Sequence, residues 1–230
     1  MNLSHLHPRQ FWSDETGLTV LLIFSLGYFI VLNSLGGFWG GRLVAQIFFS
    51  LIIVAGVLTT FKQKWLSALV IVLAVASLAL NWAKEIRPIE GLAVLTTGLS
   101  LIYLGILLAV VIAQVFRDGP VTAYRIHGAI LIYLLLGAIW ALSYQVVALT
   151  IPQAFRWPEN LLAGDSDVLR QELMYFSFIT LTTTGYGDIT AVYPVARTLV
   201  MLEALVGQLY PAIILARLVS LAIIHRKGTS

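Results

Sequence analysis

The stretch that decides the fold is Thr183-Thr184-Gly185-Tyr186-Gly187-Asp188. A glycine stands on each side of the tyrosine, and glycine adopts positive φ without the steric cost that other residues meet. A backbone of this kind can turn successive carbonyl oxygens towards one axis. The stretch lies before the last of six long apolar segments, so its surroundings decide what those carbonyls face.

The composition places most of the chain in a lipid bilayer. Its 230 residues are 59% hydrophobic and 11% charged, whereas about 25% of the residues of a soluble domain are charged. In a membrane protein a net charge of +3 relates to lipid headgroups and to orientation, so no nucleic-acid partner is indicated. The chain has no cysteine, which excludes disulfides and thiolate metal sites. We expect no cleaved signal peptide, because the first apolar segment is a full-length span with no evident small-residue cleavage site.

Six segments are long and apolar enough to cross a bilayer as helices, which takes about 20 residues. The predicted spans are 18–35, 43–61, 65–82, 91–116, 126–151 and 195–224. Most links between them are short, including the glycine-rich link at 36–41, which favours antiparallel neighbours. The sequence therefore predicts an all-α membrane protein with a four-helix transmembrane domain at 1–120 and a second domain at 121–230.

The second domain contains one apolar segment that is too short to span. Residues 152–168 form a polar, turn-rich loop, and the apolar, aromatic segment 169–182 follows. We expect a re-entrant half-helix there, with Asp167 capping its start. Non-helical backbone at 183–188 is tolerated at membrane depth only where it is buried in protein or lines water. A pore lining satisfies this condition.

From about residue 125 to residue 226 the chain resembles the pore module of the potassium-channel superfamily. Outer helix, pore helix, filter and inner helix occur in order, as in the short bacterial six-helix channels. The resemblance implies an ion-binding filter at Thr183, Thr184, Gly185, Tyr186 and Gly187. The first four carbonyls, with the Thr183 hydroxyl, would replace the water shell of a potassium ion.

The resemblance also implies an assembly and an orientation. One chain supplies one filter strand, so we expect a homotetramer around a fourfold axis in contact with membrane lipids. The filter opens outwards, which places both termini in the cytoplasm and makes the chain a multi-pass protein of the plasma (inner) membrane. Lysine and arginine alone do not decide the orientation, because they divide almost evenly between the two sides.

Five residues are expected to support the filter: Tyr175, Phe176, Ile179, Asp188 and Glu203. Tyr186 should point into an aromatic cuff of Tyr175, Phe176 and Phe178, and Tyr175 should hydrogen-bond Asp188. Ile179 stands where many members of the superfamily have glutamate, so one buried carboxyl is absent. Glu203 lies inside the last span and should brace it against the pore helix, either protonated or paired with Thr180 or Thr182.

The last span carries the predicted gate. Gly207 is the expected hinge, and Pro211, one turn later, should interrupt the helical hydrogen bonds. The pore-facing residues are predicted to be Gln208, Pro211, Leu215, Val219 and Ile223. An apolar constriction from Leu215 to Ile223 would gate by dewetting. For Arg217 we expect snorkelling or a pairing with the preceding helix rather than a ligand role.

The first four spans offer little for voltage to act on. Span 91–116 contains no lysine or arginine, and moving one charge through the membrane is worth about 2.3 kcal/mol per 100 mV. We therefore expect weak or no voltage gating. Only six residues follow Ile224, so we expect no ligand-binding domain there. The sequence identifies no gating ligand or partner.

The sequence predicts a potassium-selective channel that conducts passively, with potassium ions in the filter and no cofactor. A non-selective cation channel is the alternative, because Thr184 and Ile179 depart from common potassium-channel residues. A non-conducting membrane sensor or scaffold that keeps the pore fold is a further possibility. An enzyme is not expected, since the threonines at 180–184 have no base partner.

Overall fold

The computed structural model describes residues 16–35, 39–60, 64–86, 91–116, 123–158 and 166–227. Helices account for almost all of this part of the chain. Their bounds are α2 (Thr16–Leu35), α3 (Trp39–Thr60), α4 (Lys64–Ile86), α5 (Leu92–Val115), α6 (Ala123–Thr150), α7 (Ser166–Leu181) and α8 (Pro194–Lys227).

Five helices in the described residues are long and apolar enough to cross a membrane, namely α2, α3, α5, α6 and α8. The predicted all-α membrane fold is therefore confirmed. The predicted third span forms α4, which has 23 residues, but its apolar portion within the described side chains is only Val70–Ala83. A sixth crossing remains a prediction.

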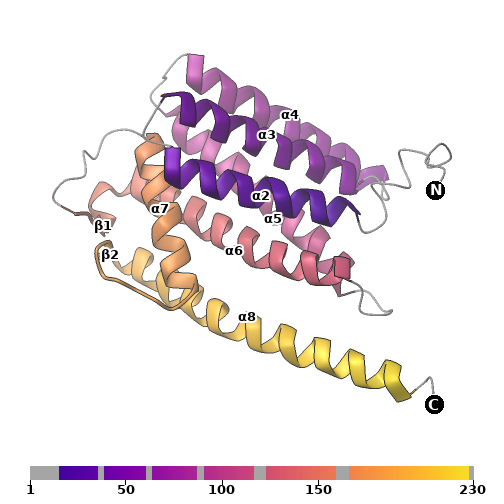
Figure 1. Cartoon of the computed structure of the whole chain (residues 1–230). Helices are drawn as coiled ribbons and strands as arrows, with labels where there is room; N and C mark the ends of the chain where they lie inside the picture. The colour runs from indigo at the N-terminus through magenta and orange to yellow at the C-terminus, as the bar shows by residue number, and fades with distance from the viewer. Residues whose placement is uncertain are drawn as a thin grey trace.

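The helices are arranged as a bundle with one element lying across it (Figure 1). α2 packs on α3 and α6, α4 packs on α3 and α5, and α5 packs on α6. α7 runs across one end of the bundle against α6, α8 and α2. α8 follows α6 and then continues beyond the bundle.

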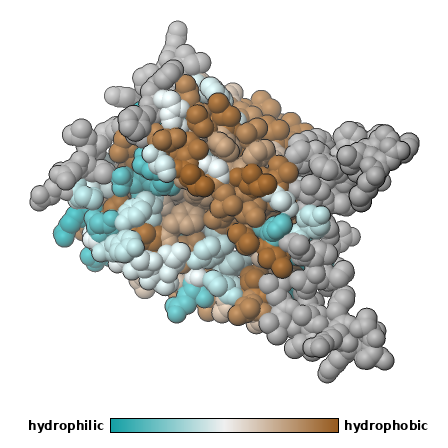
Figure 2. Space-filling model, in the orientation of Figure 1, coloured by the Kyte–Doolittle hydropathy of each residue, from teal (hydrophilic) through white to brown (hydrophobic). Residues whose placement is uncertain are grey.

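A single apolar core joins the first helices to α6. Its most deeply buried side chains include Leu21, Ile53, Tyr103, Val111 and Leu131. Apolar residues also cover the visible face of the bundle, while hydrophilic residues gather towards the end that carries α7 and the small sheet (Figure 2). This distribution is the one expected of helices that stand in hydrocarbon.

The link between α2 and α3 is shorter than the sequence suggested. The glycine-rich stretch 36–41 was predicted to be non-helical, but α3 already begins at Trp39. A β-carbon on Gly41 would lie 1.8 Å from the carbonyl oxygen of Leu35. Glycine at this position therefore lets the start of α3 approach the end of α2.

The segment before α7 contains order that the sequence did not predict. A 3-10 turn, η2 (Pro152–Ala154), leads into β1 (Phe155–Arg156). β1 pairs antiparallel with β2 (Thr190–Ala191), with Phe155 opposite Ala191. This two-stranded sheet ties the segment after α6 to the segment before α8. The rest of the predicted loop, residues 159–165, lies outside the described residues.

Candidate functional site

Residues 183–188, which lie in the connection between α7 and β2, are called the glycine loop below. α7 covers Ser166–Leu181, close to the predicted half-helix at 169–182. The helix starts before Asp167, so this residue lies in the first turn and is not the predicted cap. The Asp167 side chain lies outside the described residues.

The backbone of the glycine loop alternates. Thr183, Gly185 and Gly187 have φ values of 57°, 54° and 82°, whereas Thr184 and Tyr186 have negative φ. The positive φ predicted for the two glycines is confirmed. The same value at Thr183 was not predicted, because a β-branched residue rarely adopts it, at a cost of about 1–3 kcal/mol.

The end of α7 holds the loop by its amides. The N–H groups of Thr184 and Gly185 both donate to the carbonyl oxygen of Ile179, at 2.8 and 3.0 Å. The Thr183 N–H donates to the Thr180 carbonyl at 2.9 Å. The carbonyls of Thr183, Thr184, Gly185 and Tyr186 accept no hydrogen bond from any described residue. The N–H groups at the start of the loop therefore donate to α7, and the four carbonyl oxygens are left as free acceptors.

The predicted aromatic cuff around Tyr186 does not form within the chain. Tyr186 is 72% exposed. Phe176 packs against Tyr144 of α6, with ring centres 5.2 Å apart, and Phe178 meets Phe29 of α2 edge to face at 4.6 Å. Both phenylalanines pack α7 on the bundle, Phe176 against α6 and Phe178 against α2.

The predicted bond between Tyr175 and Asp188 is confirmed. The Tyr175 hydroxyl donates to the Asp188 carboxylate at 2.7 Å, and the other carboxylate oxygen accepts the Ile189 N–H at 3.0 Å. The hydrogen bond to Asp188, helped by burial, raises the pKa of Tyr175 to about 12. The phenol therefore keeps its proton at physiological pH and remains the donor in this bond.

Thr184 and Ile179, the two departures from the superfamily pattern, are both accommodated. The hydroxyl of Thr184 lies 3.0 Å from that of Thr182, close enough for a hydrogen bond. The Ile179 side chain is buried among apolar neighbours, and its carbonyl is the acceptor for the loop amides. Ile179 thus contributes through its backbone.

Glu203 of α8 is fully buried and braces three helices. Its carboxylate accepts a hydrogen bond from Ser177 of α7 at 2.5 Å and another from Tyr144 of α6. The predicted contact with the helix before the loop is confirmed, but the predicted partners are wrong. The Thr180 and Thr182 hydroxyls donate instead to carbonyls of α7 itself, as threonine in a helix commonly does.

Gly207 allows a close approach between α8 and the end of α7. A β-carbon at Gly207 would lie 1.9 Å from the carbonyl oxygen of Leu181, which also accepts the Tyr133 hydroxyl at 3.1 Å. Pro211 does not end the helix, since α8 is helical from Pro194 to Lys227. Proline has no N–H, so the Gly207 carbonyl lacks its usual helical donor even though the helix continues.

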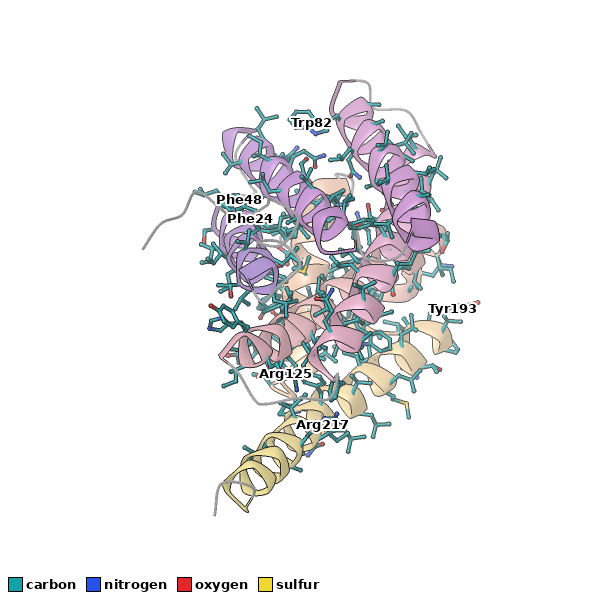
Figure 3. All side chains as sticks on the ribbon, turned by 90° about the vertical axis from the view of Figure 1, so that its right-hand side faces the viewer. Phe24, Phe48, Trp82, Arg125, Tyr193 and Arg217 are labelled. Atoms are coloured by element: carbon teal, nitrogen blue, oxygen red, sulfur yellow. The ribbon has the colours of Figure 1, made fainter. Side chains whose placement is uncertain are left out.

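Two further contacts hold the second half of α8. The Tyr210 hydroxyl donates to the Ala129 carbonyl at 2.7 Å. Arg217 donates to the Phe116 carbonyl at 2.9 Å and lies 4.8 Å from the centre of the Phe116 ring. Figure 3 shows the position of Arg217 on α8. Of the two alternatives for Arg217, pairing with the preceding helix is wrong, because Arg217 meets the end of α5, and snorkelling stays a prediction.

The predicted pore-facing residues lie on the side of α8 away from the bundle where they are described. Gln208, Pro211 and Leu215 are exposed, the last by 65%. The side chains of Val219 and Ile223 lie outside the described residues. The sequence missed Ser177, Tyr144 and Tyr210, which hold α8 in place. A hydroxyl inside an apolar helix is the signal that could have found them, but it does not name its partner.

Comparison with known proteins agrees with this geometry. The family model described as an ion channel matches residues 128–223, from α6 through the glycine loop into α8. Protein LctB of Bacillus caldotenax is 30% identical over 125 residues, which cover 51% of this chain and 92% of that protein. The chain belongs to the ion-channel family.

A second relative of the channel is Protein LctB of Geobacillus stearothermophilus, 31% identical over 80 residues. That alignment covers 35% of this chain and 59% of the relative. No solved structure matches the channel. The family assignment and the five apolar helices together identify a multi-pass membrane protein. α2 to α5 lie outside the segment that the family model matches.

Proposed function

We propose that this channel conducts potassium passively and selectively, with the glycine loop as its filter. The observation that carries the proposal is that the amides and the carbonyls of the loop backbone have different partners. The amides of Thr183, Thr184 and Gly185 are bound to α7, while the carbonyls from Thr183 to Tyr186 are free to coordinate an ion. Rings of backbone carbonyls that replace a hydration shell are the means by which potassium filters select their ion.

The proposal requires four copies of the chain in the plasma membrane. Each copy supplies one strand of the filter, and a closed ring of strands needs rotational symmetry. α8 has the surface for such an assembly, since only 11% of its span-length stretch is buried within the chain, against 56% for α6. In this arrangement the exposed face of α8 lines the pore and meets neighbouring copies, and both termini are cytoplasmic.

The alternative with most support is a non-selective cation channel, which Thr184 and Ile179 first suggested. Two observations favour potassium selectivity over it. The extra hydroxyl of Thr184 has a hydrogen-bonding neighbour in Thr182. The carboxyl that Ile179 lacks has a counterpart in Glu203, which also braces the helix behind the loop.

The test is ion flux into liposomes from the purified protein, with potassium compared with sodium. We expect wild type to pass potassium at least about tenfold faster than sodium, and Gly185→Asp to abolish the flux, because aspartate does not tolerate the positive φ as glycine does. Gly105→Ala is the matched control, since a β-carbon at Gly105 meets no atom within 4 Å.

Three outcomes of this experiment count against the proposal. Equal potassium and sodium flux favours the non-selective channel, and no flux favours the non-conducting scaffold. Equal flux from wild type and Gly185→Asp would rule out the glycine loop as the filter. Native mass spectrometry of the same preparation should find four chains, and a different number contradicts the tetramer.

A further inference from the structure

α7 is held by both parts of the chain. α8 contacts it through Glu203 and Ser177, and α6 through Tyr144 and Phe176. On its other side α7 packs against α2, which lies outside the segment matched by the ion-channel family model. The contact between α2 and α7 therefore joins a helix outside the matched segment to the helix that holds the glycine loop.

The central contact is between Phe29 of α2 and Phe178 of α7. Their rings meet edge to face with centres 4.6 Å apart and planes at 78°, the arrangement that aromatic pairs favour. The other side of the Phe178 ring occupies the space at Gly137 of α6, where a β-carbon would lie 2.5 Å from the ring. Phe178 is thus confined between α2 and α6.

A polar contact repeats this docking further along both helices. The Gln171 side chain donates to the Asn33 carbonyl at 3.2 Å. Asn33 lies one turn after Phe29 on α2, and Gln171 lies two turns before Phe178 on α7, so the two contacts share one face of each helix. In addition, the Arg170 guanidinium lies 5.5 Å from the centre of the Phe49 ring of α3.

Phe178 is also connected to the glycine loop by hydrogen bonds through Thr182. Its carbonyl oxygen accepts the Thr182 N–H at 3.0 Å and the Thr182 hydroxyl at 2.7 Å. That hydroxyl lies 3.0 Å from the hydroxyl of Thr184. Displacement of Phe178 therefore reaches Thr184 through one residue and two hydrogen bonds.

We propose that Phe29 is a positioning residue for ion selection. From the four-helix domain it fixes the place of Phe178 and, through α7, the geometry of the glycine loop. The first helices of the chain thus act on the filter itself, by a contact within one chain. This inference rests on the proposed function of the glycine loop as the filter.

The experiment compares Phe29→Ala with Phe48→Ala. Phe48 of α3 also packs on α2, where its ring lies 2.3 Å from the position of a β-carbon on Gly27. Gly27 is two residues from Phe29, so it lies on nearly the opposite face of α2. Figure 3 shows Phe48 beside Phe24. Each substitution removes a phenylalanine ring that is in contact with a neighbouring helix. Only Phe29→Ala removes the contact with α7.

Two measurements are made on the assembled protein in liposomes. Hydrogen exchange reports the opening of the amides at 182–185, and flux reports the potassium-to-sodium ratio. We expect Phe29→Ala to speed exchange of these amides about 3- to 10-fold, the scale of an aromatic pair, and to lower the flux ratio. Phe48→Ala should leave both close to wild type. Phe29→Leu, which keeps an apolar side chain, should be intermediate and serves if Phe29→Ala does not assemble.

Coupling is checked by combining Phe29→Ala with Phe178→Ala. If Phe29 acts through Phe178, the double variant should resemble Phe178→Ala alone. Additive effects, or equal exchange in Phe29→Ala and Phe48→Ala, overturn the inference. Because exchange needs no ion flux, a non-conducting wild type would disprove the filter without being confused with a failure of this contact.

Discussion

Glu203 shows how a single buried carboxylate organises the site. It is 0% exposed and accepts hydrogen bonds from the hydroxyls of Ser177 and Tyr144, which belong to two other helices. We expect Glu203→Ala to destabilise the folded protein by about 2–4 kcal/mol, because it leaves both hydroxyls unpaired and opens a cavity. Glu203→Gln should cost less than half as much, since its amide oxygen can still accept one of the two bonds.

Thermal unfolding of the purified protein in detergent measures both variants. Equal losses for alanine and glutamine would show that the volume of the side chain matters and its oxygen atoms do not. Loss of potassium selectivity in Glu203→Ala, with the assembly still intact, would agree with a brace behind the filter.

At this scale the sequence predicted some contacts and not others. The Tyr175–Asp188 bond and the positive φ of Gly185 and Gly187 followed from residues close together in the chain. The partners of Glu203 did not, because Tyr144 is 59 residues away and only the packing of α6 on α8 brings it close. Phe178 was placed in the cuff because sequence spacing alone does not show which face of α7 meets α2.

Among the elements, α8 depends on a single close contact with α7. Gly207→Ala would place a methyl group 1.9 Å from the Leu181 carbonyl oxygen, and a backbone oxygen at the end of a helix cannot move aside easily. We expect this variant to lose about 1–3 kcal/mol of stability and to show altered flux. Gly105→Ala in α5 is the matched control, and it should be neutral or slightly stabilising because alanine favours a helix more than glycine does.

Thermal unfolding and liposome flux of the two alanine variants decide the matter. Unchanged stability of Gly207→Ala would mean that α8 stands further from α7 than described, and would leave Gly207 free to act as the predicted hinge. The helices themselves were the most predictable part of the fold, because runs of about 20 apolar residues have few other stable states in a bilayer. The β1–β2 pair was missed, since two-residue strands leave almost no pattern in a sequence.

For the whole molecule, the arrangement of charges argues against a voltage sensor. α5 contains no lysine or arginine across its 24 residues, so the membrane field has no fixed charge to move there. We expect current through reconstituted channels to vary almost linearly between about −100 and +100 mV in symmetric potassium. Planar-bilayer recording measures this directly, and a steep rise equivalent to several gating charges would contradict it.

The division into a four-helix domain and a pore domain remains a prediction at this scale. The described contacts show why a sequence cannot settle it. α2 packs on α6 and α7 as well as on α3, so part of the core belongs to both halves of the chain. The number of copies in the assembly is likewise a matter of symmetry, which one chain does not display.

The contact between Arg217 and the end of α5 affects how often α8 occupies the position described. An exposed contact of a guanidinium with one carbonyl and one ring is worth about 1 kcal/mol, roughly a fivefold preference for this position. If the four α8 helices of the proposed assembly move together, their fivefold preferences for this position multiply to roughly 600-fold. A weak bond in each copy would then hold the whole ring of inner helices in one state, and a signal that frees Arg217 in every copy would release them together.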